Sequence, residues 1–169
     1  VLTDGESYKI LPSAKDYKRI GEGDTGLNTG GMGAISPVPF ADRFYIEKVE
    51  REIIKPTVEG LQKDNITYQG FIFIGLINVK GEPKVIEYNV RMGDPECQTI
   101  MTRLNTDFLE IVNAATTNNL SKLNVKWKKQ KSICIVVCAN GYPEKYKKND
   151  EIKKLKNLNL KKNNFIFHA

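Results

Sequence analysis

"YQGFIFIGLINVKGEPKVIEYNV", residues 68–90, contains two apolar runs joined by the short polar segment "VKGEP". Apolar runs of this length, bounded by Gly and Pro, predict β-strands, and a short Gly-containing connection between them predicts a hairpin. Because each run is almost continuously apolar, we expect both strands to be largely buried. The hairpin is the strongest structural signal in the chain.

Polar side chains interrupt the second apolar run near its end. Strand alternation places Glu87, Asn89 and Arg91 on one face, about 6.5 to 7 Å from one to the next. Carboxylate and amide oxygens suit Mg²⁺, which commonly takes one or two protein oxygens together with water and phosphate. A guanidinium beside them would stabilise negative charge on a phosphoryl group. The alternative is a solvated sheet face with a weak Glu–Arg pair.

The residues that follow this strand form a turn with two carboxylates, Gly93-Asp94-Pro95-Glu96. The Gly and Pro predict the turn, and it lies at the carboxyl end of the strand, where mixed folds tend to bind ligands. Asp94 and Glu96 are therefore candidates for orienting a substrate or assisting as a base. As turn residues they could equally be structural.

A second candidate site lies upstream, in a glycine-rich segment. Residues 21–40 contain six Gly and two Pro, too many for a regular element, so we expect a long loop between residues 12 and 40. Consecutive backbone N–H groups in such a loop suit an anion such as phosphate, although glycine runs are also common in flexible loops. The segment matches neither a Walker loop nor the dinucleotide fingerprint. Upstream, Asp16, Lys18 and Arg19 could neutralise phosphate and orient an amine, or could belong to a solvated loop.

Further elements are predicted by periodicity and capping residues. We expect a hairpin over residues 1–12 around Asp4-Gly5. Helices are expected from Ala41 to about Lys63, with a kink or break at Pro56, from Pro95 to Leu104, and from Asp107 to about Thr117. A buried strand is expected over 132–139 and a strand-like segment over 163–169. Asp42 and Asp107 are the expected N-caps. The chain starts with Val1 inside a predicted sheet, so we expect both ends to be cut from a longer polypeptide.

The composition, 169 residues with 40% apolar content, is sufficient for a core. No apolar run approaches the roughly 18 residues of a membrane span, and no signal segment is visible, so we expect a cytoplasmic protein. The three cysteines lack the spacing of a disulfide framework. A zinc site from Cys134 and Cys138 would lack good further ligands, and we expect both to be buried on one face of a strand.

Charge is unevenly distributed along the chain. Residues 1–120 carry 13 basic and 17 acidic side chains, whereas residues 121–169 carry 13 and 3, a net charge of +10. A basic tail can bind nucleic acid, but this one alternates Lys with Asn and is better explained as a solvated face. The shift in charge and composition predicts a boundary, with a first domain over 1–120, a linker over 121–131 and the start of another domain over 132–169.

Several of these stretches together resemble one enzyme family. They are "KDYKRIGEGDTGLNTGGMGAISP", "YQGFIFIGL", "KVIEYNVRMGDPECQ", "ICIVVCANGYPEKY" and the terminal "FHA". In this order and spacing they resemble the phosphoribosylamine-glycine ligases, also called glycinamide ribonucleotide synthetases. The stretch from Arg91 to Gln98 is the most specific, and the resemblance extends over almost the whole chain. Ile35, Tyr17 and the Lys- and Asn-rich tail depart from the family pattern without removing a proposed ligand.

The resemblance implies an α+β fold, the carboxyl-side lobe of an ATP-grasp domain with an antiparallel sheet and packed helices, plus the start of a small C-terminal domain. It implies an enzyme of de novo purine biosynthesis that joins glycine to 5-phosphoribosylamine through a glycyl phosphate, with ATP as co-substrate. Its partners would be these small molecules, with no nucleic acid and no membrane, and we expect a monomer. Without the remainder of the family's longer chain, we expect this fragment to be inactive.

The resemblance also implies roles for particular residues. Glu87 and Asn89 would hold Mg²⁺ or Mn²⁺, and Arg91 would contact the transferred phosphoryl group. Asp94 is the second expected catalytic residue. The residues expected to bind substrate are Asp16, Lys18, Asn28, Gly30, Gly31, Met32, Gly33 and Glu96. Two other hypotheses stay open: another ATP-grasp enzyme such as a carboxylase, and a nucleic-acid-binding module that depends on the lysine tail.

Overall fold

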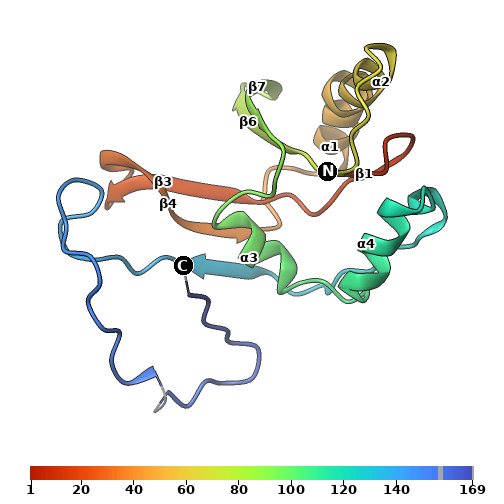
Figure 1. The fold of residues 1–169 in the computed structure, drawn as a ribbon. Coiled ribbons are helices and arrows are strands. Elements are labelled where there is room, and N and C mark those ends of the chain that lie inside the picture. Colours follow the sequence, from red (N-terminus) through yellow and green to blue (C-terminus); the bar gives the residue numbers. More distant parts are fainter. Residues whose placement is uncertain (156–157, 169) are drawn as a thin grey trace.

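The computed structural model describes residues 1–155 and 158–168 and has an α+β fold in which all strand pairs are antiparallel (Figure 1). Within the described residues the strands form three small sheets, of order β2-β1-β5, β3-β4-β8 and β6-β7. The strands are β1 Leu2–Thr3, β2 Tyr8–Lys9, β3 Lys15–Gly21, β4 Thr25–Ser36, β5 Gly70–Phe71, β6 Phe73–Val79, β7 Glu82–Asn89 and β8 Ser132–Ile135.

The helices confirm most of the predicted boundaries. They are α1 Arg43–Val49, a π-helical turn Glu50–Ile54, α2 Lys55–Lys63, α3 Glu96–Met101, α4 Phe108–Thr116 and a 3-10 turn Leu120–Lys122. Asp42 caps α1 by accepting a hydrogen bond from the Tyr45 backbone N–H, and Asp107 caps α4 by accepting one from Leu109. No helix among the described residues is long and apolar enough to span a membrane.

The predicted hairpin of residues 1–12 is confirmed, and it is built on a buried carboxylate. Burial raises the pKa of Asp4, but hydrogen bonds from Ser7, Glu6 and the Leu120 backbone N–H outweigh it and hold the pKa below its usual value. The contact with Leu120 joins β1 to the segment after α4. The core there consists of Leu2, Ile111, Ala115 and Leu120, with Leu11, Phe71, Leu104, Leu123 and Val125 packed around it.

The prediction of a long irregular loop between residues 12 and 40 is wrong. Most of it forms the β3–β4 hairpin, with β8 paired to the other edge of β4 (Figure 1). Glycines are tolerated in β4 because its ladder contains irregularities and close contacts with neighbouring segments, described below. Here tertiary contacts outweigh the low strand propensity of Gly.

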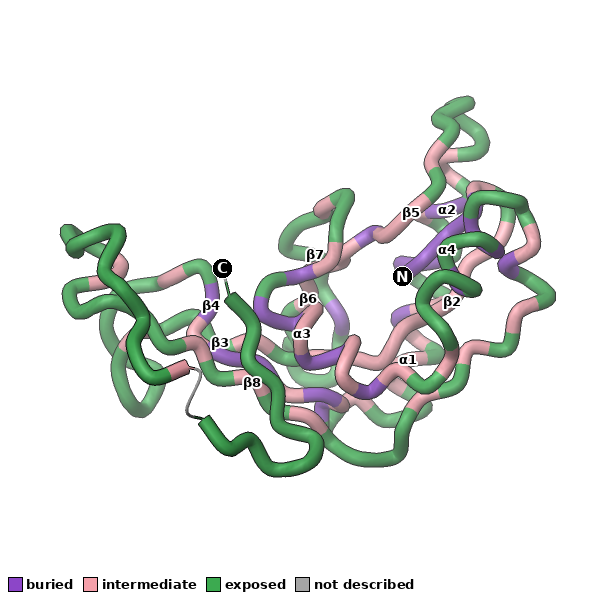
Figure 2. The backbone as a smooth tube through the Cα atoms, turned by 60° about the horizontal axis from the view of Figure 1, so that its bottom comes forward, coloured by how far each residue is buried: buried purple, intermediate pink, exposed green. Residues whose placement is uncertain are grey.

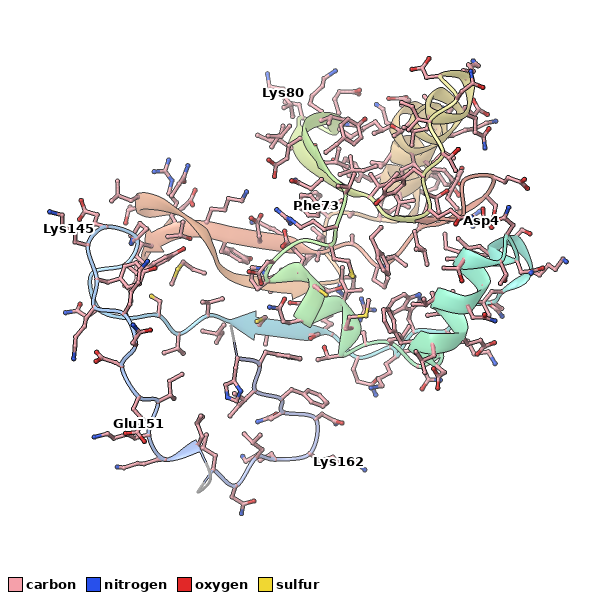
Figure 3. The ribbon with its side chains drawn as sticks, viewed as in Figure 1. Asp4, Phe73, Lys80, Lys145, Glu151 and Lys162 are labelled. Atoms are coloured by element: carbon pink, nitrogen blue, oxygen red, sulfur yellow. The ribbon has the colours of Figure 1, made fainter. Side chains whose placement is uncertain are left out.

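The β6–β7 hairpin is confirmed, with Lys80-Gly81 as its connection, but its predicted burial is wrong. Figure 3 shows Lys80 at the tip of the hairpin and Phe73 at its base. Ile86 is 66% exposed and Val90 is 76% exposed, and most of β7 is coloured as exposed in Figure 2. An apolar run reports only that a strand can be buried; whether it is covered depends on what packs against it.

Residues beyond α4 also differ from expectation. The strand predicted over 132–139 ends at Ile135, and its exposed residues alternate with half-buried ones, so the prediction of a buried strand is wrong. Cys134 is half-buried but Cys138 is exposed, because the strand has ended before it. Residues 163–168 form no strand, and Ala169 lies outside the described residues. The segment after β8 loops out and returns toward β8, and most of its described residues are exposed (Figures 1 and 2).

Candidate functional site

Strand β7 places two of the predicted metal ligands on one face. The ladder pairs Glu87 with Gly75 and Asn89 with Phe73 of β6. The register shift in this hairpin lies before Glu87, so Glu87 and Asn89 belong to a regular stretch and, being two residues apart, project from the same face. Arg91 lies beyond the last residue of the strand, and strand alternation therefore does not fix its direction.

Glu87 and Asn89 both carry polar groups that lack a partner among the described residues. A Cβ atom at Gly75 would lie 3.0 Å from Cγ of Glu87, so the glycine provides the space that the Glu87 side chain occupies. Glu87 is exposed and forms no ion pair with any described residue. The buried Nδ2 of Asn89 has no hydrogen-bond partner. Because an unpaired buried donor costs roughly 1–3 kcal/mol, a hydrogen-bond acceptor such as a phosphate oxygen would be favoured beside Nδ2, whereas a metal ion would bind Oδ1 of the same amide.

The donor set fits a metal that shares its ligands with a phosphate. Within residues 1–155 and 158–168, no group of three or more His, Cys, Asp or Glu side chains is arranged to hold a metal by itself. One free carboxylate beside one amide matches the low number of protein ligands that Mg²⁺ commonly takes when phosphate oxygens and water supply the others. Glu87 and Asn89 thus fit a metal–nucleotide site better than a closed structural site.

Arg91 presents a largely unused guanidinium. Its Nη1 donates a hydrogen bond to the backbone carbonyl of Met92 at 2.9 Å, and the residue is exposed. A guanidinium has five N–H donors, so four remain for an anion. The local backbone contact orients the side chain without neutralising its charge.

The turn after Arg91 is closely packed. The Oδ1 atom of Asp94 accepts a hydrogen bond from Nε2 of Gln98 at 2.8 Å. A Cβ atom at Gly93 would lie 2.5 Å from Oε2 of Glu96 and 2.7 Å from Cε2 of Phe73. Gly93 is required here because any side chain would collide with both groups.

Glu96 lies at the centre of a group of charges. It is only 6% exposed, and burial raises the pKa of its carboxyl. The negative charges of Asp16 and Asp94 raise this pKa further, whereas the Glu96 backbone N–H and Lys18 lower it. Lys18 also forms an ion pair with Asp16 at 3.6 Å. The structure therefore brings together four side chains that the sequence placed in two separate segments.

The glycine-rich segment forms a wide bulge within β4. Gly33 pairs with Tyr17 and Asn28 pairs with Arg19, so residues 29–32 lie opposite the single residue Lys18. Bulges of this kind disrupt the ladder locally and are frequent beside active sites. The predicted glycine site is thus an interruption of a strand instead of a free loop.

This bulge packs directly against the Asp94–Pro95 turn. Gly31 is buried, has a φ of +137°, and a Cβ atom there would lie 2.6 Å from Cδ of Pro95 and 2.9 Å from the carbonyl oxygen of Asp94. Only glycine combines this backbone conformation with this approach. The two segments that the sequence singled out are in contact.

The expectation that these glycines wrap an anion with consecutive N–H groups is wrong for two of them. The N–H of Gly30 donates to the hydroxyl of Tyr142 at 3.0 Å, and that of Gly31 donates to Oγ1 of Thr29 at 3.0 Å. These donors already have partners in the protein. A substrate that contacts the bulge must therefore bind groups other than these two N–H groups.

The sequence reasoning missed Phe73, Gly75, Gln98 and Tyr142 as residues that shape this site. Tyr142 lies in the stretch "ICIVVCANGYPEKY" that resembles the family, but no role was predicted for it. No local signal connects it with a glycine 112 residues away.

Two cavities are found away from the Glu87–Asn89 pair. One of about 530 Å³ lies between β2 and the α1–α2 segment, lined by Tyr8, Glu50 and Lys55 among others. A second of about 190 Å³ lies on the β3–β4–β8 sheet and is lined partly by Met32 and Gly33. Neither Glu87 nor Asn89 lines either of these two cavities, whereas Met32 and Gly33 line the second.

Comparison with known proteins identifies the family. Residues 1–97 match the family described as phosphoribosylglycinamide synthetase, ATP-grasp (A) domain. The chain belongs to this family. It is 43% identical over 168 residues to the phosphoribosylamine–glycine ligase of Caldanaerobacter subterraneus, covering 99% of this chain and 40% of that protein. It is 47% identical over 170 residues to the bifunctional purine biosynthetic protein PUR2,5 of Pichia angusta, covering 99% of this chain and 21% of that protein.

A solved member of the family has a similar structure. The crystal structure of the phosphoribosylamine–glycine ligase from Thermotoga maritima matches with a TM-score of 0.70 and 36% identity, over 85% of this chain and 36% of that one. The α+β fold therefore corresponds to part of an ATP-grasp phosphoribosylglycinamide synthetase. The chain spans less than half the length of each of these relatives.

Proposed function

We propose that the protein carrying this chain is a phosphoribosylamine–glycine ligase. It joins glycine to 5-phosphoribosylamine and converts ATP to ADP and phosphate, giving glycinamide ribonucleotide in de novo purine biosynthesis. The printed names of relatives that are 43% and 36% identical support this reaction. The observation that carries the proposal is the contact of Gly31 with the Asp94–Pro95 turn, because it joins the two family-specific segments in one site.

The chemistry requires activation of a carboxylate. Forming an amide in water is uphill, so glycine is first phosphorylated to glycyl phosphate, which the amine of phosphoribosylamine then attacks. Phosphoryl transfer depends on positioning and charge neutralisation and needs no protein nucleophile. The bound metal supplies neutralisation of phosphate charge. Glu87 and Asn89 would hold it, as Mg²⁺ or Mn²⁺, and the free N–H groups of Arg91 would bind the oxygens of the transferred group.

The cluster around Glu96 is proposed to bind substrate. Asp94 has its carboxylate oriented by Gln98 and would orient the attacking amine. Glu96, held buried beside Lys18 and Asp16, would position the substrate groups that reach the turn. Asn28, Gly30, Gly31, Met32 and Gly33 would form the opposite wall.

The direct test is ATP- and glycine-dependent release of phosphate by the full-length protein, with phosphoribosylamine as acceptor. Arg91→Ala should lower kcat at least a hundredfold, as expected for loss of a charge that stabilises the transition state. Arg43→Ala is the matched control, because that exposed arginine pairs with Glu47 on α1. An unchanged rate in Arg91→Ala would remove the proposed role, and turnover of bicarbonate or another acid in place of glycine would point to a different ATP-grasp enzyme.

Further properties follow from the proposal. The protein would be a cytoplasmic monomer that uses small-molecule substrates and neither nucleic acid nor membrane. The division into an ATP-grasp part over 1–120, a linker over 121–131 and a C-terminal domain from 132 stays a prediction. We also propose that the 169-residue chain alone binds MgATP weakly and is inactive, which calorimetric titration would test.

A further inference from the structure

Tyr142 contacts the glycine bulge from a distant part of the chain. Its hydroxyl accepts a hydrogen bond from the Gly30 backbone N–H at 3.0 Å, across 112 residues of sequence. A Cβ atom at Gly30 would lie 3.4 Å from the same hydroxyl, so the approach is close even for glycine. The residue belongs to the segment after β8, outside the part of the chain that contains the other proposed site residues.

Tyr142 is itself held in place. Its ring packs edge to face against Tyr146, with centroids 5.5 Å apart and an interplanar angle of 71°. Its N–H donates to the carbonyl of Ala139 at 3.2 Å. The preceding Gly141 has a φ of +94°, and a Cβ atom there would lie 2.6 Å from the carbonyl oxygen of Lys145. The turn is therefore a specific structure that presents the hydroxyl to the bulge.

We infer that Tyr142 is a positioning residue of the proposed ligase: its hydroxyl fixes the bulge of residues 29–32 in the geometry that binds substrate. This inference rests on the proposed function. The bulge is not paired in the β3–β4 ladder. Contacts at its two central glycines hold it in place. Gly31 is packed against Asp94 and Pro95, and Gly30 is hydrogen-bonded to Tyr142. The second contact makes the segment after β8 part of the site.

Loss of the Tyr142 hydroxyl should weaken the binding of glycine or phosphoribosylamine and leave the binding of ATP unchanged. The Gly30 N–H would lose its partner, and the bulge would populate other conformations. A neutral hydrogen bond contributes enough to change a binding constant about fivefold. We expect KM for glycine or phosphoribosylamine to rise by about this factor. The KM for ATP should stay unchanged, because Glu87 and Asn89 are positioned by the separate β6–β7 hairpin.

The experiment compares Tyr142→Phe with Tyr146→Phe in the full-length protein. Both substitutions remove one hydroxyl and keep the ring pair, but only the first removes a contact with the bulge. Steady-state kinetics for each substrate are combined with amide hydrogen exchange of residues 29–32. The expected result is a raised KM for glycine or phosphoribosylamine and faster amide exchange of residues 29–32 in Tyr142→Phe alone.

Other outcomes separate the two proposals. An active wild-type enzyme with unchanged KM values and unchanged exchange in Tyr142→Phe would overturn the inference, and so would equal changes in both variants. A wild-type protein without glycine-dependent phosphate release would overturn the proposed function. In that case the exchange measurement alone would still decide whether Tyr142 holds the bulge.

Discussion

The hairpins β3–β4 and β6–β7 both carry proposed site residues, yet they are positioned differently. In β6–β7 a two-residue connection leads into a ladder with one register shift, and Glu87 and Asn89 follow in a regular stretch. In β3–β4 four residues of one strand lie opposite one residue of the other. Local pairing fixes the first group of residues, whereas contacts with the Asp94–Pro95 turn and with Tyr142 fix the second.

Substitutions in the two hairpins should therefore have different effects, on activity in one and on stability in the other. An exposed carboxylate on β7 is not needed to hold its hairpin together, so its replacement should remove function and leave stability nearly unchanged. A buried glycine in the β4 bulge lies where two segments that are distant in sequence pack together. Its replacement should therefore lower the stability of the fold.

Glu87→Gln should have the largest effect on activity. It removes the negative charge from the proposed metal pair, and we expect at least a hundredfold loss of ATP-dependent turnover, about 2.7 kcal/mol, with little change in unfolding free energy. The control is Glu82→Gln on the same strand, where the exposed carboxylate pairs with Lys48 instead. Steady-state kinetics at several Mg²⁺ concentrations would measure the loss of turnover. Equal activity of the two variants would argue against a metal role for Glu87.

Gly31→Ala should destabilise the protein by about 2 kcal/mol, because the added Cβ collides with Pro95 and Asp94 in a strained backbone conformation. The matched control is Gly81→Ala in the β6–β7 connection. Gly81 also has a positive φ, of +89°, but a Cβ there meets no atom within 4 Å, so only the conformational cost of about 1 kcal/mol remains. Urea denaturation would compare them, and equal losses would show that the contact with the turn is unimportant.

Glu96 of α3 and Glu82 of β7 should contribute to stability with opposite pH dependence. Burial and the charges of Asp16 and Asp94 raise the pKa of Glu96, so the folded state binds its proton more tightly than the unfolded state. The contribution of Glu96 to the unfolding free energy therefore falls as pH rises from about 4.5 toward the raised pKa. Glu82 is the opposite case: its hydrogen bond and charge interaction with Lys48 lower its pKa, and its contribution is lost as pH falls below 4.5.

Denaturation between pH 3 and 7 would measure this smallest effect. Relative to the wild type, Glu96→Gln should gain stability as pH rises, and Glu82→Gln should lose it. The same sign in both variants would contradict the proposed environment of Glu96.

The sequence predicted features that depend on neighbouring residues. Asp42 and Asp107 were recognised as caps because their side chains bond to backbone N–H groups two or three residues away. The β6–β7 hairpin was recognised because two apolar runs flank a Gly-containing connection. The exposure of Ile86 and Val90 was not predicted, because apolar character does not reveal which segments cover a strand.

The β4 strand shows most clearly where sequence reasoning failed. Its glycines read as a loop because glycine has low strand propensity, and nothing near them in sequence indicates Pro95 or Tyr142 as contacts. The cluster around Glu96 could not be predicted for the same reason, since Asp16 and Lys18 lie about eighty residues away in the chain.

Residue type and short spacing were sufficient to predict the polar residues at the end of β7, the helix caps and the resemblance to the synthetase family. Only the tertiary structure decided that the glycine segment is a strand with a bulge, that it lies against the Asp94–Pro95 turn, and that Tyr142 holds it. The physical reason is that these contacts join segments separated by tens of residues, and their energies come from steric fit and burial that no local pattern encodes.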